Sequence, residues 1–321
     1  KGTNKVFKIN EQLSGSVFST GFCILRCSDK INNNFLYWYL LSDSFQKMKN
    51  YFSGDGIMGG IGNVNIKKVQ INVPDINTQK KVVAKLDECF ESIDKARENV
   101  EMNLQNAKDL FQSQLNEIFS QKGDGWEEKN LSQIGIVQTG TTPPTKDKTN
   151  YGSYIPFVKP PHFNSDGSIN AGDSMLSKSG LEKGRLFPPN SVLMVCIGAT
   201  IGKTGFTEIP ISSNQQINCL TPEERYNSKF FYYGLISPFV QKQVADIGKG
   251  SQATLPFINK SKWQDLRINI PKNKETQDEV VKILESLKAK TISVQLNYQQ
   301  ELDALDELKK SILEKAFNGE L

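Results

Sequence analysis

The stretch that decides the fold occurs twice, as "INVPDINTQKKVVAKL" at residues 71–86 and as "INIPKNKETQDEVVKIL" at residues 268–284. In each copy a short strand-like run ends at a proline, and a Thr-Gln pair then opens a long helical pattern. The two prolines are 197 residues apart, and the offset is 198 from the glutamines onward. Self-similarity at a nearly constant offset is typical of a repeated structural unit. The chain is therefore predicted to contain two copies of one supersecondary unit.

The repeat extends upstream, because "FLYWYLLS" (35–42) resembles "FFYYGLIS" (230–237) at an offset of 195. The second copy starts near Gly125-Trp126, whereas the first begins part way in, with "KGTNKVFKI" falling near "IGATIGKTGF" (197–206). Roughly 75 residues of a complete first copy are expected to be absent. We interpret the chain as a fragment, a truncated gene product or a permuted form.

Each copy ends in a long helical pattern with a heptad stripe. The first stripe contains Val83, Phe90, Arg97, Leu104, Phe111 and Ile118, with Leu86, Ile93, Val100, Ala107 and Gln114 beside it. The second contains Val280, Leu284, Leu287, Val294, Tyr298, Leu302, Leu305 and Ile312. Such stripes favour a coiled coil. Each helix is expected to cover about 42 residues, or about 60 Å. Two similar helices in one chain are predicted to pair antiparallel and to hold two domains apart.

Signals at the helix ends are also visible. Thr276-x-x-Glu279 is typical of a capping box at the start of the second long helix, and Gly319 is a stop signal at its end. The fold class is predicted to be α+β, with two mixed α/β domains in a pseudo-two-fold repeat joined by two long helices. The predicted domains are 1–77, a central helix 78–122, 123–275 and a C-terminal helix 276–321.

The second domain contains readable strands and helices. "RLFPPNSVLMVCIG" (185–198) predicts a turn and a buried strand, and "ISSNQQINCLTP" (211–222) alternates like one further strand. "NSKFFYYGLISPFVQKQVADIG" (227–248) predicts a helix interrupted near Pro238. Its aromatic residues are predicted to belong to the core.

Composition excludes several classes of protein. Hydrophobic residues make up 37% and charged residues 23% of the chain, which is typical of a soluble globular protein. No apolar run is long enough to span a bilayer, and no signal peptide is visible. The five cysteines include no C-x-x-C pair, so we expect reduced thiols and a cytoplasmic location without membrane contact. The single histidine, His162, excludes a His-rich metal site.

Charge is distributed in blocks. The net charge is +4 in 1–77, −1 in 78–122, +4 in 123–275 and −3 in 276–321. Basic blocks that alternate with neutral or acidic ones suggest that the two predicted domains face a polyanion.

Two glycine-rich stretches imitate nucleotide motifs. "GDGIMGGIG" (54–62) begins as G-x-G-x-x-G, but a dinucleotide fingerprint must leave a strand and open a helix. Here a helical pattern precedes it and a strand-like "NVNIKKVQINVP" follows. "GATIGKTG" (198–205) lacks the first glycine of a P-loop, since Ile197 takes that place. We therefore expect no cofactor bound by this chain, and the first stretch is interpreted as a loop between a helix and a strand.

The complete copy resembles the specificity subunit of type I restriction-modification enzymes. The resemblance is carried by "GWEEKNLSQIGIVQTGTTPPTKDKTNYGSYIPFVKPPHF", "GATIGKTGF", "NQQINCL", "GKGSQATLPFINKSKWQDLRINIP", "ETQDEVV" and "ILEKAFNGEL", in this order. It covers essentially the whole chain, except that the first target-recognition domain is incomplete. It implies a non-catalytic subunit whose two recognition domains each read half of a bipartite, asymmetric DNA site. It also implies a helical spacer that docks two methyltransferase subunits, which would bind S-adenosylmethionine, and a restriction-translocase subunit.

Basic and polar side chains in expected loops are the candidate DNA contacts. Phosphate contacts position such a domain and base-edge contacts specify its target. The candidates in the second domain are Lys146, Lys148, Lys159, His162, Lys178, Lys183, Arg185, Lys203, Gln252 and Thr254. Those in the first domain are Lys5, Lys8, Lys67 and Lys68.

Two other readings stay open at this stage. The chain fits the recognition region of a single-chain restriction-methylation enzyme, although the nearest strings to an adenine-methyltransferase motif, at 142–145 and 159–162, lack its amide and aromatic residues. It also fits a coiled-coil adaptor without a DNA role. The sequence does not specify the DNA target, the spacer length or the residues that touch bases.

Overall fold

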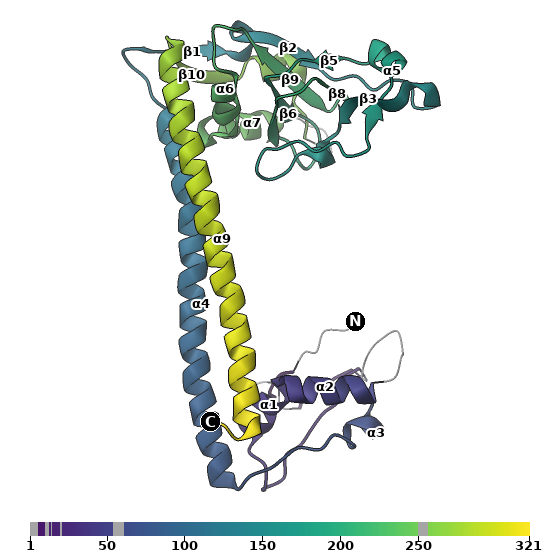
Figure 1. Cartoon of the computed structure of the whole chain (residues 1–321), viewed down its shortest axis with the longest axis vertical. Helices are drawn as coiled ribbons and strands as arrows, with labels where there is room; N and C mark the ends of the chain where they lie inside the picture. Colours follow the sequence, from purple (N-terminus) through teal and green to yellow (C-terminus); the bar gives the residue numbers. More distant parts are fainter. Residues whose placement is uncertain (1–5, 10–12, 14, 20, 54–60, 250–255) are drawn as a thin grey trace. The chain divides into compact units, whose positions relative to one another are not determined.

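The computed structural model describes residues 6–9, 13, 15–19, 21–53, 61–249 and 256–321 (Figure 1). The chain divides into two compact units: unit 1 is Lys1–Gln105 with Val294–Leu321, and unit 2 is Asn106–Ser293. Both long helices, α4 (Ile76–Phe119) and α9 (Lys274–Asn318), contribute one end to each unit. Their lengths of 44 and 45 residues agree with the heptad stripes. The four domain boundaries drawn from the sequence stay a prediction.

Among its described residues, unit 1 contains three short helices beside the paired ends of α4 and α9. They are α1 (Asn33–Leu41), α2 (Asp43–Phe52) and α3 (Asn63–Ile66). Asn32 caps α1 by accepting from the backbone N–H groups of Asn34 and Phe35. The core of the unit joins Leu86 and Phe90 of α4 to Leu313 and Ala316 of α9, with the α1 side chain Trp38 packed against them.

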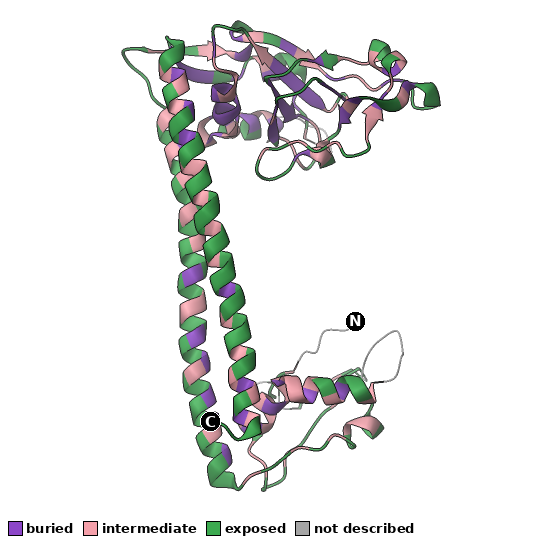
Figure 2. Ribbon diagram, viewed as in Figure 1, coloured by how far each residue is buried: buried purple, intermediate pink, exposed green. Residues whose placement is uncertain are grey.

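The long helices run antiparallel within unit 1, as predicted. Asp94 pairs with Lys309, and Arg97 pairs with Asp306, so positions along α4 rise as positions along α9 fall. Figure 2 shows buried positions recurring along both long helices. The buried α4 residues of the stripe in this unit are Val83, Leu86, Phe90, Ile93 and Val100.

The stripe predicted for α9 is wrong at one position, because Val294 is 39% exposed. Val280 is half-buried and packs against the core of unit 2, where its neighbour Val281 is 5% exposed. The predicted capping box is also misplaced. Helix α9 begins at Lys274, and Asn273 caps it by accepting from the Thr276 N–H at 3.1 Å. Gly319 ends the helix as predicted, with a φ of +80° that favours glycine.

The described part of unit 2 holds three sheets. In the first, β1 (Trp126–Asn130) pairs with β10 (Arg267–Pro271). In the second, the order is β2 (Gly135–Thr139), β9 (Ile217–Pro222), β6 (Ser191–Val195), β7 (Thr204–Thr207). In the third, it is β4 (Met175–Leu176), β3 (Tyr151–Val158), β8 (Ile211–Ser213), β5 (Leu186–Phe187). All pairs are antiparallel except β3 with β8.

Helices and 3-10 turns complete unit 2. The helices are α5 (Lys178–Lys183), α6 (Ser228–Ile236), α7 (Pro238–Lys249) and α8 (Lys260–Gln264). The turns are η2 (Leu131–Gln133), η3 (Lys148–Asn150) and η4 (Pro160–His162). The predicted helix break near Pro238 is confirmed, because α6 ends before Ser237 and α7 starts at the proline.

Alternation along β6 divides the core of unit 2 into two layers. Val192 and Met194 face a cluster that contains the α6 aromatics and the ends of the long helices, whereas Leu193 and Val195 face a cluster with Phe187 and Ile211 of the third sheet. Successive side chains of a strand point to opposite faces, so a strand covered on both sides is apolar throughout. Because both faces of β6 are covered, the stretch 185–198 contains the buried strand predicted from its continuous apolar residues. Phe231, Tyr232 and Tyr233 are buried, as predicted.

Two strand predictions are wrong in detail. The stretch 211–222 forms two strands in different sheets, β8 and β9, because the chain turns at Asn214–Gln216. The stretch 63–74 forms the short helix α3 and then a run without strand pairing. Its counterpart in unit 2, β10, pairs with β1, whereas the described residues of unit 1 contain no strand that could pair with it. Side chains supply some of the backbone partners there, since the Tyr39 hydroxyl donates to the Gln70 carbonyl and the Gln79 amide to the Pro74 carbonyl.

Candidate nucleic-acid interface

Six strand ends of unit 2 meet at one edge, which we call the loop edge and define as residues 140–142, 159–163, 196–203 and 214–216. The register places the end of β2 and the end of β6 against the start of β9. The start of β7 lies against the end of β6. Strands β3 and β8 are parallel, so both end together. The Asn214 N–H donates to the Val158 carbonyl, which joins the two larger sheets at this edge.

Three predicted DNA contacts lie on the loop edge: Lys159, His162 and Lys203. Lys159 and Lys203 are exposed, and His162 is half-buried. The Lys159 N–H donates to Nδ1 of His162 at 3.1 Å, which fixes the imidazole over the η4 turn. Burial and the charge of Lys159 hold the pKa of His162 below its ordinary value. A neutral ring with Nδ1 occupied presents Nε2–H as a hydrogen-bond donor.

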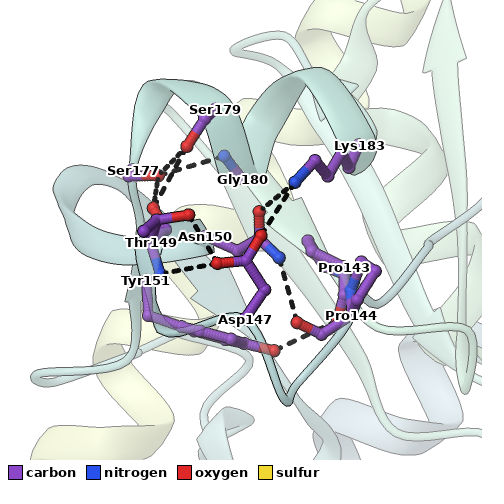
Figure 3. A network of polar contacts seen from close by, with 10 residues as sticks. All are labelled: Pro143, Pro144, Asp147, Thr149, Asn150, Tyr151, Ser177, Ser179, Gly180 and Lys183. Atoms are coloured by element: carbon purple, nitrogen blue, oxygen red, sulfur yellow. Dashed lines mark hydrogen bonds and ion pairs between the residues drawn. The ribbon is translucent and has the colours of Figure 1, made fainter.

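A second group of predicted contacts lies around α5. Lys146, Lys148 and Lys178 are exposed there. Lys183 is bound within the protein, because its ammonium donates to Asp147 at 3.1 Å and to Asn150 at 2.9 Å (Figure 3). Figure 3 also shows Ser177 and Ser179 reaching the Thr149 carbonyl. This network fixes the loop that carries Lys146 and Lys148 against α5.

The two groups lie at opposite ends of β3. The α5 group flanks the start of the strand at Tyr151, and the loop edge follows its last residue, Val158. Eight residues of strand span about 25 Å. Arg185 is half-buried between α5 and β5. Tyr154, in β3, is 54% exposed and lies under the Lys178 ammonium at 5.6 Å.

The candidates of unit 1 are more dispersed. The Lys8 ammonium donates to Asn34 at 3.1 Å and lies over the Tyr37 ring. Lys67 and Lys68 are exposed at the end of α3, where Lys68 donates to Asn65 at 3.0 Å. Lys5, Gln252 and Thr254 lie outside the described residues, as do residues 54–60 of the glycine-rich stretch.

The described residues that follow Gln252 and Thr254 in the sequence, Pro256 and Phe257, contact the loop edge. The Pro256 carbonyl accepts from the Gly198 N–H at 3.0 Å, and Phe257 forms a β-bridge with Ile197. Gly202-Lys203-Thr204 leads into strand β7 and not into a helix, so the context of a P-loop is missing. The glycine-rich stretch at 54–62 follows helix α2, so the preceding strand of a dinucleotide fingerprint is missing too. The strand expected after it is replaced by α3.

Sequence reasoning missed the polar turn between β8 and β9. Asn214, Gln215 and Gln216 are predicted to belong to a strand, but they occupy the loop edge, and Gln215 is exposed. Thr142, which follows β2, donates to Oε1 of Gln215 at 2.5 Å. Two serines followed by three consecutive amide residues are a usable turn signal.

No group of His, Cys, Asp or Glu side chains among the described residues could hold a metal ion. None of the described helices is long and apolar enough to cross a membrane. All five cysteines are free thiols, as expected from their spacing.

The chain matches the family described as "Type I restriction modification DNA specificity domain" over residues 2–102 and 123–304. It is 32% identical over 203 residues to the type I restriction enzyme HindI specificity subunit of Haemophilus influenzae. That match covers 61% of this chain and 42% of the relative, so the chain spans less than half of that protein.

Two solved structures share the fold. One is a chain from a study of complex assembly and conformational transition of the type I R-M system, with a TM-score of 0.80 and 21% identity over 94% of this chain and 75% of that one. The other is the HsdS subunit from Thermoanaerobacter tengcongensis, with a TM-score of 0.61 and 21% identity over 94% and 74% of the two chains.

Proposed function

Because the chain belongs to the family of type I restriction modification DNA specificity domains, we propose that it recognises DNA sequence for a restriction-modification complex and carries no catalytic site of its own. The observation that carries this proposal is the double match to one family description, at 2–102 and 123–304. The two matched segments contain the two copies of the internal repeat. Each copy then reads one half of a bipartite target, and because the copies differ in sequence, the target is asymmetric.

The chemistry of the loop edge supports this role. The exposed side chains of Lys159 and Lys203 suit phosphate contacts, which give affinity without sequence information. The Lys203 ammonium also donates to the Phe163 carbonyl at 3.4 Å. The neutral His162 and the amides of the β8–β9 turn suit base edges, which carry the sequence information. The exposed lysines around α5 extend the basic surface to the other end of β3.

The paired long helices support a spacer and docking role. Their antiparallel packing in unit 1 combines a buried apolar stripe with the Arg97–Asp306 and Asp94–Lys309 ion pairs. We assign to these helices the spacing of the two half-sites and the binding of two methyltransferase subunits, with a restriction-translocase subunit joining that core. S-adenosylmethionine then binds to the methyltransferase subunits and not to this chain.

Methylation mapping tests the proposed function directly. The full chain is combined with methyltransferase subunits, S-adenosylmethionine and genomic DNA, and the methylated positions are sequenced. We expect methylation at one bipartite, asymmetric sequence, and none when the chain is omitted. Uniform methylation, or the same sites without the chain, would contradict the proposal. Methylation of DNA by the chain alone would favour a single-chain enzyme. Binding to the methyltransferase subunits through the long helices, without any binding to DNA, would favour an adaptor.

A further inference from the structure

We propose that Gln215 reads an adenine in the major groove and that Thr142 holds its carboxamide in the reading orientation. This inference rests on the proposed function, because it names one specificity-determining residue within the loop edge. Gln215 is an exposed side chain on the turn between β8 and β9, and Thr142 follows β2. They are 73 residues apart in the sequence, so only the folded domain brings them together.

The turn that carries Gln215 is fixed by its backbone on several sides. The Asn214 N–H donates to the Val158 carbonyl at 3.1 Å, and the Cys196 N–H donates to the Gln216 carbonyl at 2.8 Å. On the third side, the Thr141 N–H donates to the Ser213 carbonyl at 2.8 Å. The ends of β3, β6 and β2 therefore all hold this turn. A base-reading group must be held on rigid elements to discriminate between bases.

Side chains within the turn fix it further. The Asn214 amide donates to Oε1 of Gln216 at 2.8 Å, and its Oδ1 accepts from the Gln216 N–H at 3.2 Å. The Asn214 and Gln216 amides therefore bind each other, and Gln215 between them points to solvent. Gly140 allows the close crossing, because a Cβ at this position would lie 2.2 Å from the Asn214 carbonyl oxygen.

The carboxamide of Gln215 is oriented before any ligand arrives. The Thr142 hydroxyl donates to Oε1 of Gln215 at 2.5 Å, which leaves the second lone pair of Oε1 and both Nε2 hydrogens available. Adenine offers an N6 donor and an N7 acceptor in the major groove, and a glutamine carboxamide matches this pair with two hydrogen bonds. Guanine offers two acceptors at the same edge, so Oε1 would face an acceptor there.

The surroundings fit a nucleic acid partner. Lys159 follows β3, and its strand end is bonded to Asn214 of the turn. Lys203 precedes β7 at the same edge. Both ammonium-bearing side chains are exposed. An exposed amide on a fixed turn, flanked by exposed cations, combines a base-reading group with phosphate-binding groups.

The test compares DNA preferences of the wild-type chain and its variants in the assembled complex. The full chain, bound to methyltransferase subunits, selects from a library of double-stranded DNA with randomised positions, and the bound DNA is sequenced. We expect Q215A to lose the preference for A·T at one position by about tenfold or more, with the preferences at the other positions retained. T142V is expected to weaken the same preference. T142S, which keeps the hydroxyl, is expected to retain the wild-type preference.

Gln121 supplies the matched control, because it is an exposed glutamine after α4, away from the loop edge. Q121A is expected to leave all preferences unchanged. If wild type selects a sequence and Q215A selects the same one with the same discrimination at every position, Gln215 is not a reading residue. If T142V behaves as T142S does, Thr142 has no orienting role. If wild type itself selects no sequence, the proposed function fails instead, so the two failures are distinguishable.

Discussion

The buried side chain of Gln277 accepts a hydrogen bond from the backbone N–H of Asn227, the residue that caps α6, at 3.0 Å. Its Nε2 group donates to the Pro271 carbonyl at 3.1 Å, so one amide of α9 joins the start of α6 to the end of β10 in unit 2. In unit 1, Gln79 binds the Asn32 N–H and the Pro74 carbonyl in the same way. The two copies of the repeat therefore share a polar junction as well as a sequence pattern.

Removing this junction should destabilise the protein. Gln277 is 1% exposed, so Q277A leaves the Asn227 N–H and the Pro271 carbonyl buried without a side-chain partner. We expect a loss of about 1–3 kcal/mol in the free energy of unfolding, measured by urea denaturation. Gln300 is exposed on the same helix, and Q300A should change stability by less than about 0.5 kcal/mol. Equal losses of unfolding free energy in Q277A and Q300A would show that the Gln277 hydrogen bonds do not stabilise the protein.

A side chain at Gly167 should clash with Tyr232, and Gly172 serves as the control for backbone strain alone. Both glycines have a positive φ, +85° and +52°. A Cβ on Gly167 would lie 1.8 Å from the hydroxyl oxygen of Tyr232, which is 6% exposed, whereas a Cβ on Gly172 meets nothing within 4 Å. We expect G167A to be less stable than G172A by about 2 kcal/mol in urea denaturation. Similar stabilities would mean that Tyr232 moves freely.

Arg97 and Asp306 should couple across the helix pair. Their ion pair joins α4 and α9 in unit 1, beside the buried stripe. R97E places like charges at Asp306 and Glu101, so we expect Tm to fall by about 2 °C. The double variant R97E/D306R restores opposite charges across the pair and should recover most of that loss. Additive losses in the double variant would show that the two side chains do not interact.

Thiol reactivity should separate the five cysteines into two classes. Cys196 and Cys219 are 2% and 1% exposed, and burial raises the pKa of both to about 12. Since the thiolate is the reacting form, iodoacetamide at pH 8 should label Cys89 and Cys23 but not these two, as read by peptide mass spectrometry. All five should be labelled in urea. Rapid labelling of Cys196 in the folded protein would contradict its burial.

Acid should weaken the η4 turn through His162. Its pKa is lowered in the folded state by burial and by Lys159, so the unfolded chain takes up its proton first as pH falls. The contribution of the neutral ring is therefore present above the ordinary value of 6.5 and is lost as pH falls through the lowered pKa. Between pH 7.5 and pH 5, wild type should lose more unfolding free energy than H162Q. If the unfolding free energies of wild type and H162Q change equally with pH, His162 does not contribute to the pH dependence of stability.

Local patterns in the sequence were sufficient for the helices and the repeat. The stripe through Leu86, Phe90 and Val100 marks one face of α4 as apolar, and an apolar face of that length requires a partner. The buried run of β6 and the aromatic face of α6 were equally readable. Local signals failed at element ends, because Asn273 and not Thr276 caps α9, and at Asn214, where a turn divides an apparently continuous strand.

The two-copy repeat and the pairing of the long helices follow from the sequence alone, since periodicity decides which helix face is buried. Which side chains share a surface depends on the tertiary fold. Lys183 is bound to Asp147 and Asn150, while Lys159 and His162, which follow β3, share the loop edge with Gln215 of the β8–β9 turn. The physical reason is that strand order and register arise from hydrogen bonds between residues far apart in the chain. These bonds, and no local pattern, bring Thr142 to Gln215.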